Sequence, residues 1–207
     1  MPRGFVTAFR SAGFTASLLS LIGCANPLNV GHYQRYMDLG GVAERRGDYE
    51  AARRCYVRSR NEAAAGFLGQ EAESAALYNW ARMAGMLGDF TLAEQGFKEA
   101  LRVEEMVYGA GGGHASMRWF ELARLYFAWG RYHDSVGAYE QAFGLADQLD
   151  AQKRDPVTYA ACVRDFADAL DKVGASSRAE HERARAASIR EQPPSPNILY
   201  YPSRTNQ

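Results

Sequence analysis

The chain has 207 residues, of which 47% are apolar and 23% are charged, a composition typical of a folded globular protein and not of a disordered one. Its 24 lysines and arginines balance 24 aspartates and glutamates, so no overall field would draw the chain to nucleic acid or to an anionic membrane surface. Three cysteines are too few for a disulfide scaffold, and no apolar run reaches the 18 residues or so that a transmembrane helix needs.

Residues 1–23 have the parts of a secretory signal. Arg3 and Arg10 provide a positively charged start, and no acidic residue occurs before Asp38. An apolar stretch at 14–22 follows, which is too short to cross a bilayer. A plain signal peptide, or an amphipathic helix that belongs to the fold, would also fit these residues.

The stretch Leu21-Ile22-Gly23-Cys24 at the end of this segment resembles the lipobox of bacterial lipoproteins. The resemblance implies cleavage after Gly23 and acylation of Cys24, with more than one acyl chain, as stable anchoring requires. The residue after Cys24 is Ala25 and not aspartate, which resembles lipoproteins that are sorted to the outer membrane. We therefore expect a lipid-anchored protein on the periplasmic face of a bacterial outer membrane. If translation began after Cys24, the same domain would be a cytoplasmic adaptor.

Two short segments flank residues 33–191, which we expect to fold as one domain. Residues 24–32 contain Pro27 and Gly31 and no helical period, which predicts a lipidated tether. Residues 192–207 contain four prolines and cannot form a helix, which predicts either a frayed tail or a segment that docks on the domain or on a partner.

Four glycines recur along this domain at spacings of 41, 42 and 44 residues. On both sides of each glycine, large apolar and small residues recur three or four positions apart, which places them on one face of a helix. The pattern predicts four pairs of short amphipathic helices, each pair packed antiparallel through a tight turn. The turn glycines are Gly47, Gly88, Gly130 and Gly174. The small residues at which paired helices approach most closely are Ala52, Ala93, Ser135 and Ala179.

The order of large, small and aromatic positions in WFELARLYFAWGRYHDSVGAYEQA (119–142) resembles the tetratricopeptide repeat. The usual period of that family is about 34 residues, and the longer period here resembles the kinesin light-chain type of repeat. The resemblance implies an all-α, right-handed superhelical solenoid of about four helix pairs over 33–191. A solenoid of the HEAT type has a similar period but lacks the turn in which an aromatic residue follows glycine.

The fourth pair departs from the pattern of the other three. Arg183 stands where the others have Tyr56, Phe97 and Tyr139, and the second helix of this pair is mostly polar. Because a terminal repeat has no neighbour to cover its outer face, we interpret the fourth pair as the end of the array.

In the tetratricopeptide family the first helix of each pair lines the concave face, so the resemblance implies a groove that binds a segment of another protein. Asn79 stands where family members hold a peptide backbone through an amide, and Arg82 and Arg124 recur at equivalent places suited to gripping a carboxylate. Exposed aromatic rings would serve as apolar anchors. Alternatively, these residues pack on a neighbouring helix or form a solvated face. The predicted peptide-binding residues are Tyr78, Asn79, Arg82, Phe120, Glu121, Arg124, Phe127, Arg164 and Asp168.

Patterns for catalysis or metal binding are absent from the sequence. The four histidines lack partners at metal-ligand spacing. Gly109 to His114 lacks the Lys-Ser/Thr ending of a phosphate loop. Cys55 and Cys162 fall in separate repeats, so we expect buried thiols and no bridge between them. We expect no cofactor, metal, nucleic acid or small-molecule substrate, and an envelope enzyme on a helical scaffold is a less favoured alternative.

Taken together, these features predict an adaptor of the cell envelope. A lipid on Cys24 would hold the protein at the membrane, and its concave surface would bind a segment of another envelope protein. The alternative is an assembly chaperone of the pilotin kind, acting on an outer-membrane secretin or a pilus component.

Overall fold

The computed structural model describes residues 25–109, 111–112 and 114–189, and this part of the chain contains nine α-helices and no strand. The predicted signal peptide, Cys24 and the tail at 192–207 lie outside the described residues. The helices are α1 (Pro27–Arg45), α2 (Tyr49–Ala65), α3 (Gln70–Met86), α4 (Phe90–Tyr108), α5 (Ala115–Ala128), α6 (Tyr132–Gln148), α7 (Ala151–Arg154), α8 (Pro156–Lys172) and α9 (Ser176–Ser188).

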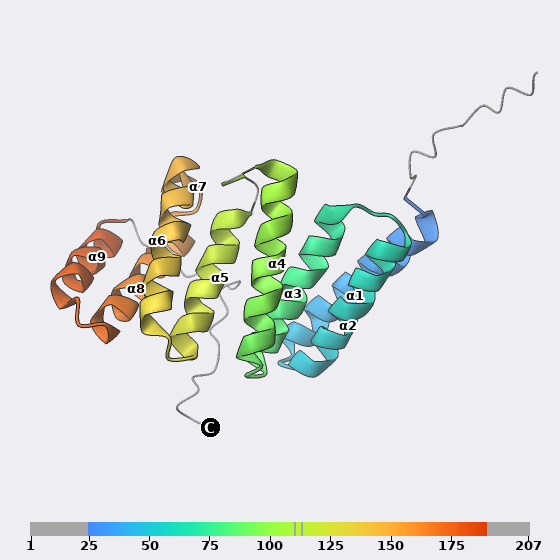
Figure 1. The fold of residues 1–207 in the computed structure, drawn as a ribbon, viewed down its shortest axis with the longest axis horizontal. Coiled ribbons are helices and arrows are strands. Elements are labelled where there is room, and N and C mark those ends of the chain that lie inside the picture. Colours follow the sequence, from blue (N-terminus) through green and yellow to red (C-terminus); the bar gives the residue numbers. More distant parts are fainter. Residues whose placement is uncertain (1–24, 110, 113, 190–207) are drawn as a thin grey trace, which may run out of the picture.

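Eight long helices form four antiparallel hairpins that stack side by side, namely α1/α2, α3/α4, α5/α6 and α8/α9. The tight turns within the hairpins lie along the lower edge in Figure 1, and the connections between hairpins lie along the upper edge. The predicted all-α solenoid of four helix pairs is therefore confirmed. The single helical turn α7, between the third and fourth hairpins, was not predicted.

Each hairpin turn is closed by a glycine in the left-handed region. The φ angles are 76° at Gly47, 82° at Gly88, 81° at Gly130 and 78° at Gly174. At the third turn the amide of Arg131 donates to the carbonyl of Tyr126 at 2.9 Å, and that of Gly130 donates to Phe127 at 3.0 Å. This pair of bonds is the Schellman motif, which satisfies the last carbonyls of a helix. The motif needs a left-handed residue, and glycine adopts that conformation easily because it has no Cβ.

Replacing Gly130 by alanine should therefore destabilise the protein by about 1–2 kcal/mol, the cost of a left-handed conformation for an L-residue. Gly137 is the matched control, because it lies within α6 and an added Cβ would meet nothing within 4 Å. Gly137→Ala should stabilise the helix by about 0.5–1 kcal/mol. Urea unfolding followed by circular dichroism measures both changes. Equal effects of the two substitutions would contradict the role of the turn.

The core forms where small residues let the paired helices approach. The four small positions after the turns are all fully buried, and the Ser135 hydroxyl donates to the Ala123 carbonyl across the third hairpin at 2.8 Å. Large side chains such as Phe97 and Leu122, both 0% exposed, fill the space around these contacts. The main cluster runs from α3 to α9, and a smaller one around Tyr56 and Met83 joins the first hairpin to the second.

The expected tether at 24–32 is wrong for residues 27–32, because α1 begins at Pro27. Asn26 caps the helix by accepting a hydrogen bond from the Leu28 amide at 3.1 Å, and proline is well suited to the first helical position. The Asn26 amide also donates to the carbonyl of Gly66 at 3.0 Å, which ties the start of α1 to the α2–α3 loop. Residues 27–32 are therefore the first turns of the domain.

Candidate binding surfaces

The first helices of the four hairpins, α1, α3, α5 and α8, are joined by polar contacts that run from repeat to repeat. We call this series the front-helix ladder. Its members are Glu44, Tyr78, Arg82, Arg118, Glu121, Arg124 and Asp165. The ladder determines which of the predicted groove residues face a partner and which hold the repeats together.

The first step of the ladder joins α1 to α3. Glu44 accepts a hydrogen bond from Arg82 at 2.8 Å and another from the Tyr56 hydroxyl at 2.9 Å. The side chains of Arg82 and Glu44 are 12% and 15% exposed, so solvent screens this ion pair weakly. It sets the position of the second repeat against the first.

The second step joins α3 to α5. The Tyr78 hydroxyl donates to Glu121 at 3.4 Å, and the Arg118 guanidinium lies 3.8 Å from the centroid of the Tyr78 ring. Arg118 also donates to the buried carboxylate of Glu104 at 3.2 Å. Burial raises the pKa of Tyr78, so this hydroxyl stays protonated at neutral pH and acts as a donor.

The third step joins α5 to α8 through Arg124. Its guanidinium lies 3.0 Å from Asp165 and 3.7 Å from Glu121, and it donates to the Cys162 sulfur at 3.0 Å. Burial opposes the charge of Arg124, but the carboxylates of Glu121 and Asp165 raise its pKa well above the usual value. Burial raises the pKa of Cys162 to about 11, so this cysteine is a thiol and not a reactive thiolate at neutral pH.

The prediction that Phe120, Glu121 and Arg124 face outward into a groove is wrong, because they are 9%, 6% and 7% exposed. Phe120 packs in the core against Phe143, with ring centroids 5.0 Å apart. The physical reason is the position of α5 in the middle of the array. The paired helix α6 covers Phe120, whereas Glu121 and Arg124 contact side chains of α3 and α8, so all three positions are buried.

The predicted residues of α3 have partners within the protein. Tyr78, Asn79 and Arg82 are partly buried, and the Asn79 amide donates to the Ala75 carbonyl of its own helix at 3.1 Å. Arg82 donates to the Asn79 oxygen at 3.1 Å, so both ends of this amide have partners within the protein.

On the last two hairpins three of the predicted residues are at least partly exposed. Phe127 is half-buried against Tyr132, with ring centroids 5.5 Å apart. Arg164 and Asp168 are exposed on α8, and Asp168 pairs with Arg183 at 2.9 Å. Peptide binding by these residues stays a prediction.

A basic depression between α2 and α3 was not predicted. It has a volume of about 410 Å³ and is lined by Arg53, Arg54, Val57, Arg58 and Trp80. Arg53 is held by Glu50 and by Asp89 of the next repeat, each at 2.8 Å. Arg54 and Arg58 are exposed one turn apart and form no ion pair with another described residue. The sequence signal was the clustering of three arginines within six positions, which the repeat pattern obscured.

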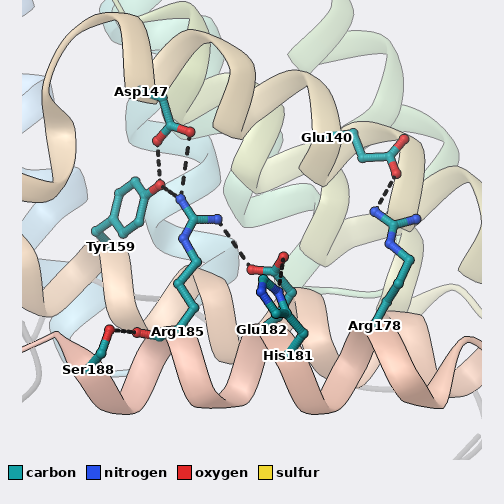
Figure 2. Close-up of polar contacts among 8 residues, drawn as sticks. All are labelled: Glu140, Asp147, Tyr159, Arg178, His181, Glu182, Arg185 and Ser188. Carbon is teal, nitrogen blue, oxygen red and sulfur yellow. Dashed lines mark hydrogen bonds and ion pairs between the residues drawn. The ribbon is translucent and has the colours of Figure 1, made fainter.

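A second polar cluster fastens the last described helix to the array. Figure 2 shows Arg185 of α9 directed at Tyr159 of α8 and Asp147 of α6, and Arg178 bonded to Glu140 of α6 at 3.0 Å. Burial and the bond to Asp147 raise the pKa of Tyr159, so its hydroxyl is not a base at neutral pH. Part of the polar surface of α9 therefore also makes contacts between helices.

Comparison with known proteins agrees with this architecture. Residues 72–148 match the family model of the tetratricopeptide repeat. These residues carry tetratricopeptide repeats. Its structure is similar to BtubC (BKLC) from P. vanneervenii, with a TM-score of 0.70, 19% identity, and coverage of 83% of this chain and 71% of that one. It is also similar to a putative kinesin light chain from P. anserina with nearly identical TPR-like repeats, with a TM-score of 0.65, 16% identity, and coverage of 75% and 74%.

No curated protein matches the sequence of this tetratricopeptide repeat protein. The structural similarities, at under one-fifth identity, establish its fold. Among the described residues, no three His, Cys, Asp or Glu side chains are grouped so that they could hold a metal ion, and both described cysteines are free. No described helix is long and apolar enough to span a bilayer. The tetratricopeptide fold indicates a module for protein–protein interaction.

Proposed function

We propose that this tetratricopeptide repeat protein is a lipid-anchored adaptor on the periplasmic face of a bacterial outer membrane. The support for the anchor is the positively charged, apolar leader that ends in Leu21-Ile22-Gly23-Cys24. The support for the adaptor role is the fold, in which the front-helix ladder holds the repeats in one arrangement before a partner arrives. A pre-organised surface lowers the entropy cost of binding.

The partner we propose is an acidic segment of another protein, bound at the basic depression between α2 and α3. The observation that carries this proposal is the pair Arg54 and Arg58. Two like charges one turn apart repel each other, and no described residue neutralises them. Each guanidinium can bind a carboxylate through two parallel hydrogen bonds. Val57, which is 40% exposed, and the half-buried ring of Trp80 add an apolar floor between them.

The test compares two double variants that remove the same charge. Arg54→Ala with Arg58→Ala should reduce the recovery of an acidic partner about tenfold, which corresponds to 1.4 kcal/mol. Lys98→Ala with Arg102→Ala is the control. These residues lie one turn apart on α4, the second helix of the next hairpin, and are already paired with Glu94 and Glu99. Crosslinking in cells followed by quantitative mass spectrometry measures recovery. Equal recovery by the two variants would reject the depression as the site.

The recovered partner also decides between the two roles of the adaptor. The peptide that corresponds to its acidic segment should bind the purified protein and lose affinity in the Arg54/Arg58 variant. If the partner is a secretin, and a deletion strain lacks secretin multimers, the protein is an assembly chaperone of the pilotin kind.

Fatty-acid labelling of wild type and of Cys24→Ala tests the lipid anchor. Label that does not depend on Cys24 would refute it.

A further inference from the structure

The start of the folded domain lies directly beside the predicted lipid attachment. Two residue steps separate Cys24 from Asn26, a span of at most about 7 Å. Asn26 in turn donates to the carbonyl of Gly66 at 3.0 Å, and the next residue in that loop is Phe67. With no tether between lipid and α1, acyl chains on Cys24 would bring this end of the domain against the bilayer.

The same edge of the molecule gathers most of the exposed apolar side chains. It is the edge along which the hairpins are connected, at the top of Figure 1, where α1, α3 and α5 begin and α2 and α4 end. Of ten large apolar residues exposed in the described part of the chain, seven lie here, and we call them the apolar edge. They are Leu28, Val30, Phe67, Met106, Val107, Tyr108 and Met117.

Phe67 is the most exposed member of the apolar edge, at 76%, and Leu28 at the start of α1 follows at 73%. Phe67 also has a φ of 53°, a conformation that residues with a Cβ rarely adopt. Holding a phenyl ring in water on a strained backbone costs free energy. Such local strain persists mainly where it serves a function. An apolar environment outside the protein would remove the cost of exposing the ring.

The charge of the apolar edge indicates how it could contact a bilayer. The segments 25–34, 61–81 and 103–117, which carry the seven residues of the apolar edge, contain no lysine or arginine. They do contain acidic residues, among them Glu71 and Glu105, which are exposed. These three segments therefore offer no charge attraction to anionic headgroups, and their contact with a bilayer must depend on apolar insertion.

We propose that the apolar edge rests on the bilayer, with Leu28 and Phe67 inserted into the boundary between headgroups and acyl chains. This proposal rests on the lipid anchor proposed above. It sets the orientation of the molecule, because the helices run from this edge to the glycine turns. With 17 to 19 residues in α1 to α4, the turns would stand about 26–29 Å from the surface. The basic depression on α2 would then face sideways, clear of the membrane.

Spin labels on the acylated full-length protein test this orientation in vesicles of the zwitterionic lipid phosphatidylethanolamine. The labelled variants are Phe67→Cys and Leu92→Cys, each with Cys55→Ser to remove the other partly exposed thiol. Leu92 is the matched control, since it is 41% exposed in the first turn of α4, at the glycine-turn edge. We expect the label at position 67 to lose accessibility to a water-soluble nickel complex at least tenfold on vesicle binding. Accessibility at position 92 should not change.

Each failure has a distinct signature. Mass spectrometry of the same sample reports whether Cys24 carries acyl chains. Acylated protein with position 67 still open to nickel would overturn the apolar edge and leave the anchor standing. Dipolar broadening between labels at position 67, which signals a second copy on the edge, would overturn it as well. Protein without acyl chains would overturn the anchor and, with it, the orientation.

Discussion

Replacing Arg124 by methionine should lower the free energy of unfolding by about 3–5 kcal/mol, the usual cost of removing one partner from a buried ion pair. Arg124 is 7% exposed and contacts Asp165 at 3.0 Å and Glu121 at 3.7 Å. Methionine keeps much of the volume but leaves both carboxylates without the guanidinium that neutralises them. Because the pair joins α5 to α8, the loss should separate unfolding of the fourth hairpin from that of the third.

Urea unfolding monitored by circular dichroism measures this loss, and hydrogen exchange of α8 and α9 locates it. Arg102→Met is the control, since Arg102 is an exposed arginine that pairs with Glu99 within its own helix, and its removal should have no measurable effect. Adding Asp165→Asn to Arg124→Met should recover part of the stability, because it removes one uncompensated charge. If Arg124→Met unfolds like wild type, the front-helix ladder does not hold the repeats together.

Replacing Phe143 by alanine should cost about 3–5 kcal/mol, as expected for a large cavity in a packed core. Phe143 is 6% exposed and sits where the third and fourth hairpins meet. Its ring centroid lies 5.0 Å from that of Phe120, 5.3 Å from Tyr159 and 5.7 Å from Phe166. Removing it deprives three rings on two other helices, α5 and α8, of a partner at once.

Phe143→Leu should cost less, about 1–2 kcal/mol, because it keeps most of the apolar volume. Both values come from the same urea titration, and the slope with urea should stay constant if the native fold is kept. A cost below 1 kcal/mol for Phe143→Ala would mean that neighbouring rings collapse into the space and that the junction is softer than its geometry indicates.

The expected losses of stability in the Arg124 and Phe143 variants have one origin, which is a weaker contact between neighbouring repeats. In a solenoid each repeat contacts only its neighbours, so stability is a sum of repeats and of the interfaces between them. Arg124 and Phe143 both act at the interface between the third and fourth repeats. A variant that loosens this interface should leave the basic depression between α2 and α3 intact, so stability and partner binding can be separated by experiment.

The sequence alone determined the features that depend on contacts between residues close along the chain. Gly47, Gly88, Gly130 and Gly174 specified the turns, because the Schellman motif needs a left-handed residue within one helix end. Small residues such as Ala52 and Ser135 specified where paired helices meet. Asn26 and Pro27 also carried a local helix-start signal, and the turn-like composition around them concealed it.

The tertiary structure decided which face of each front helix remains open. Phe120, Glu121 and Arg124 have the same helical phase as residues that would face a groove in an isolated hairpin, and periodicity cannot distinguish the two cases. Packing on α6 buries Phe120, and contacts with α3 and α8 bury Glu121 and Arg124. The basic depression likewise requires Trp80 of one repeat beside Arg54 and Arg58 of another. Such surfaces arise from the stacking of repeats, which a pattern read within one repeat does not contain.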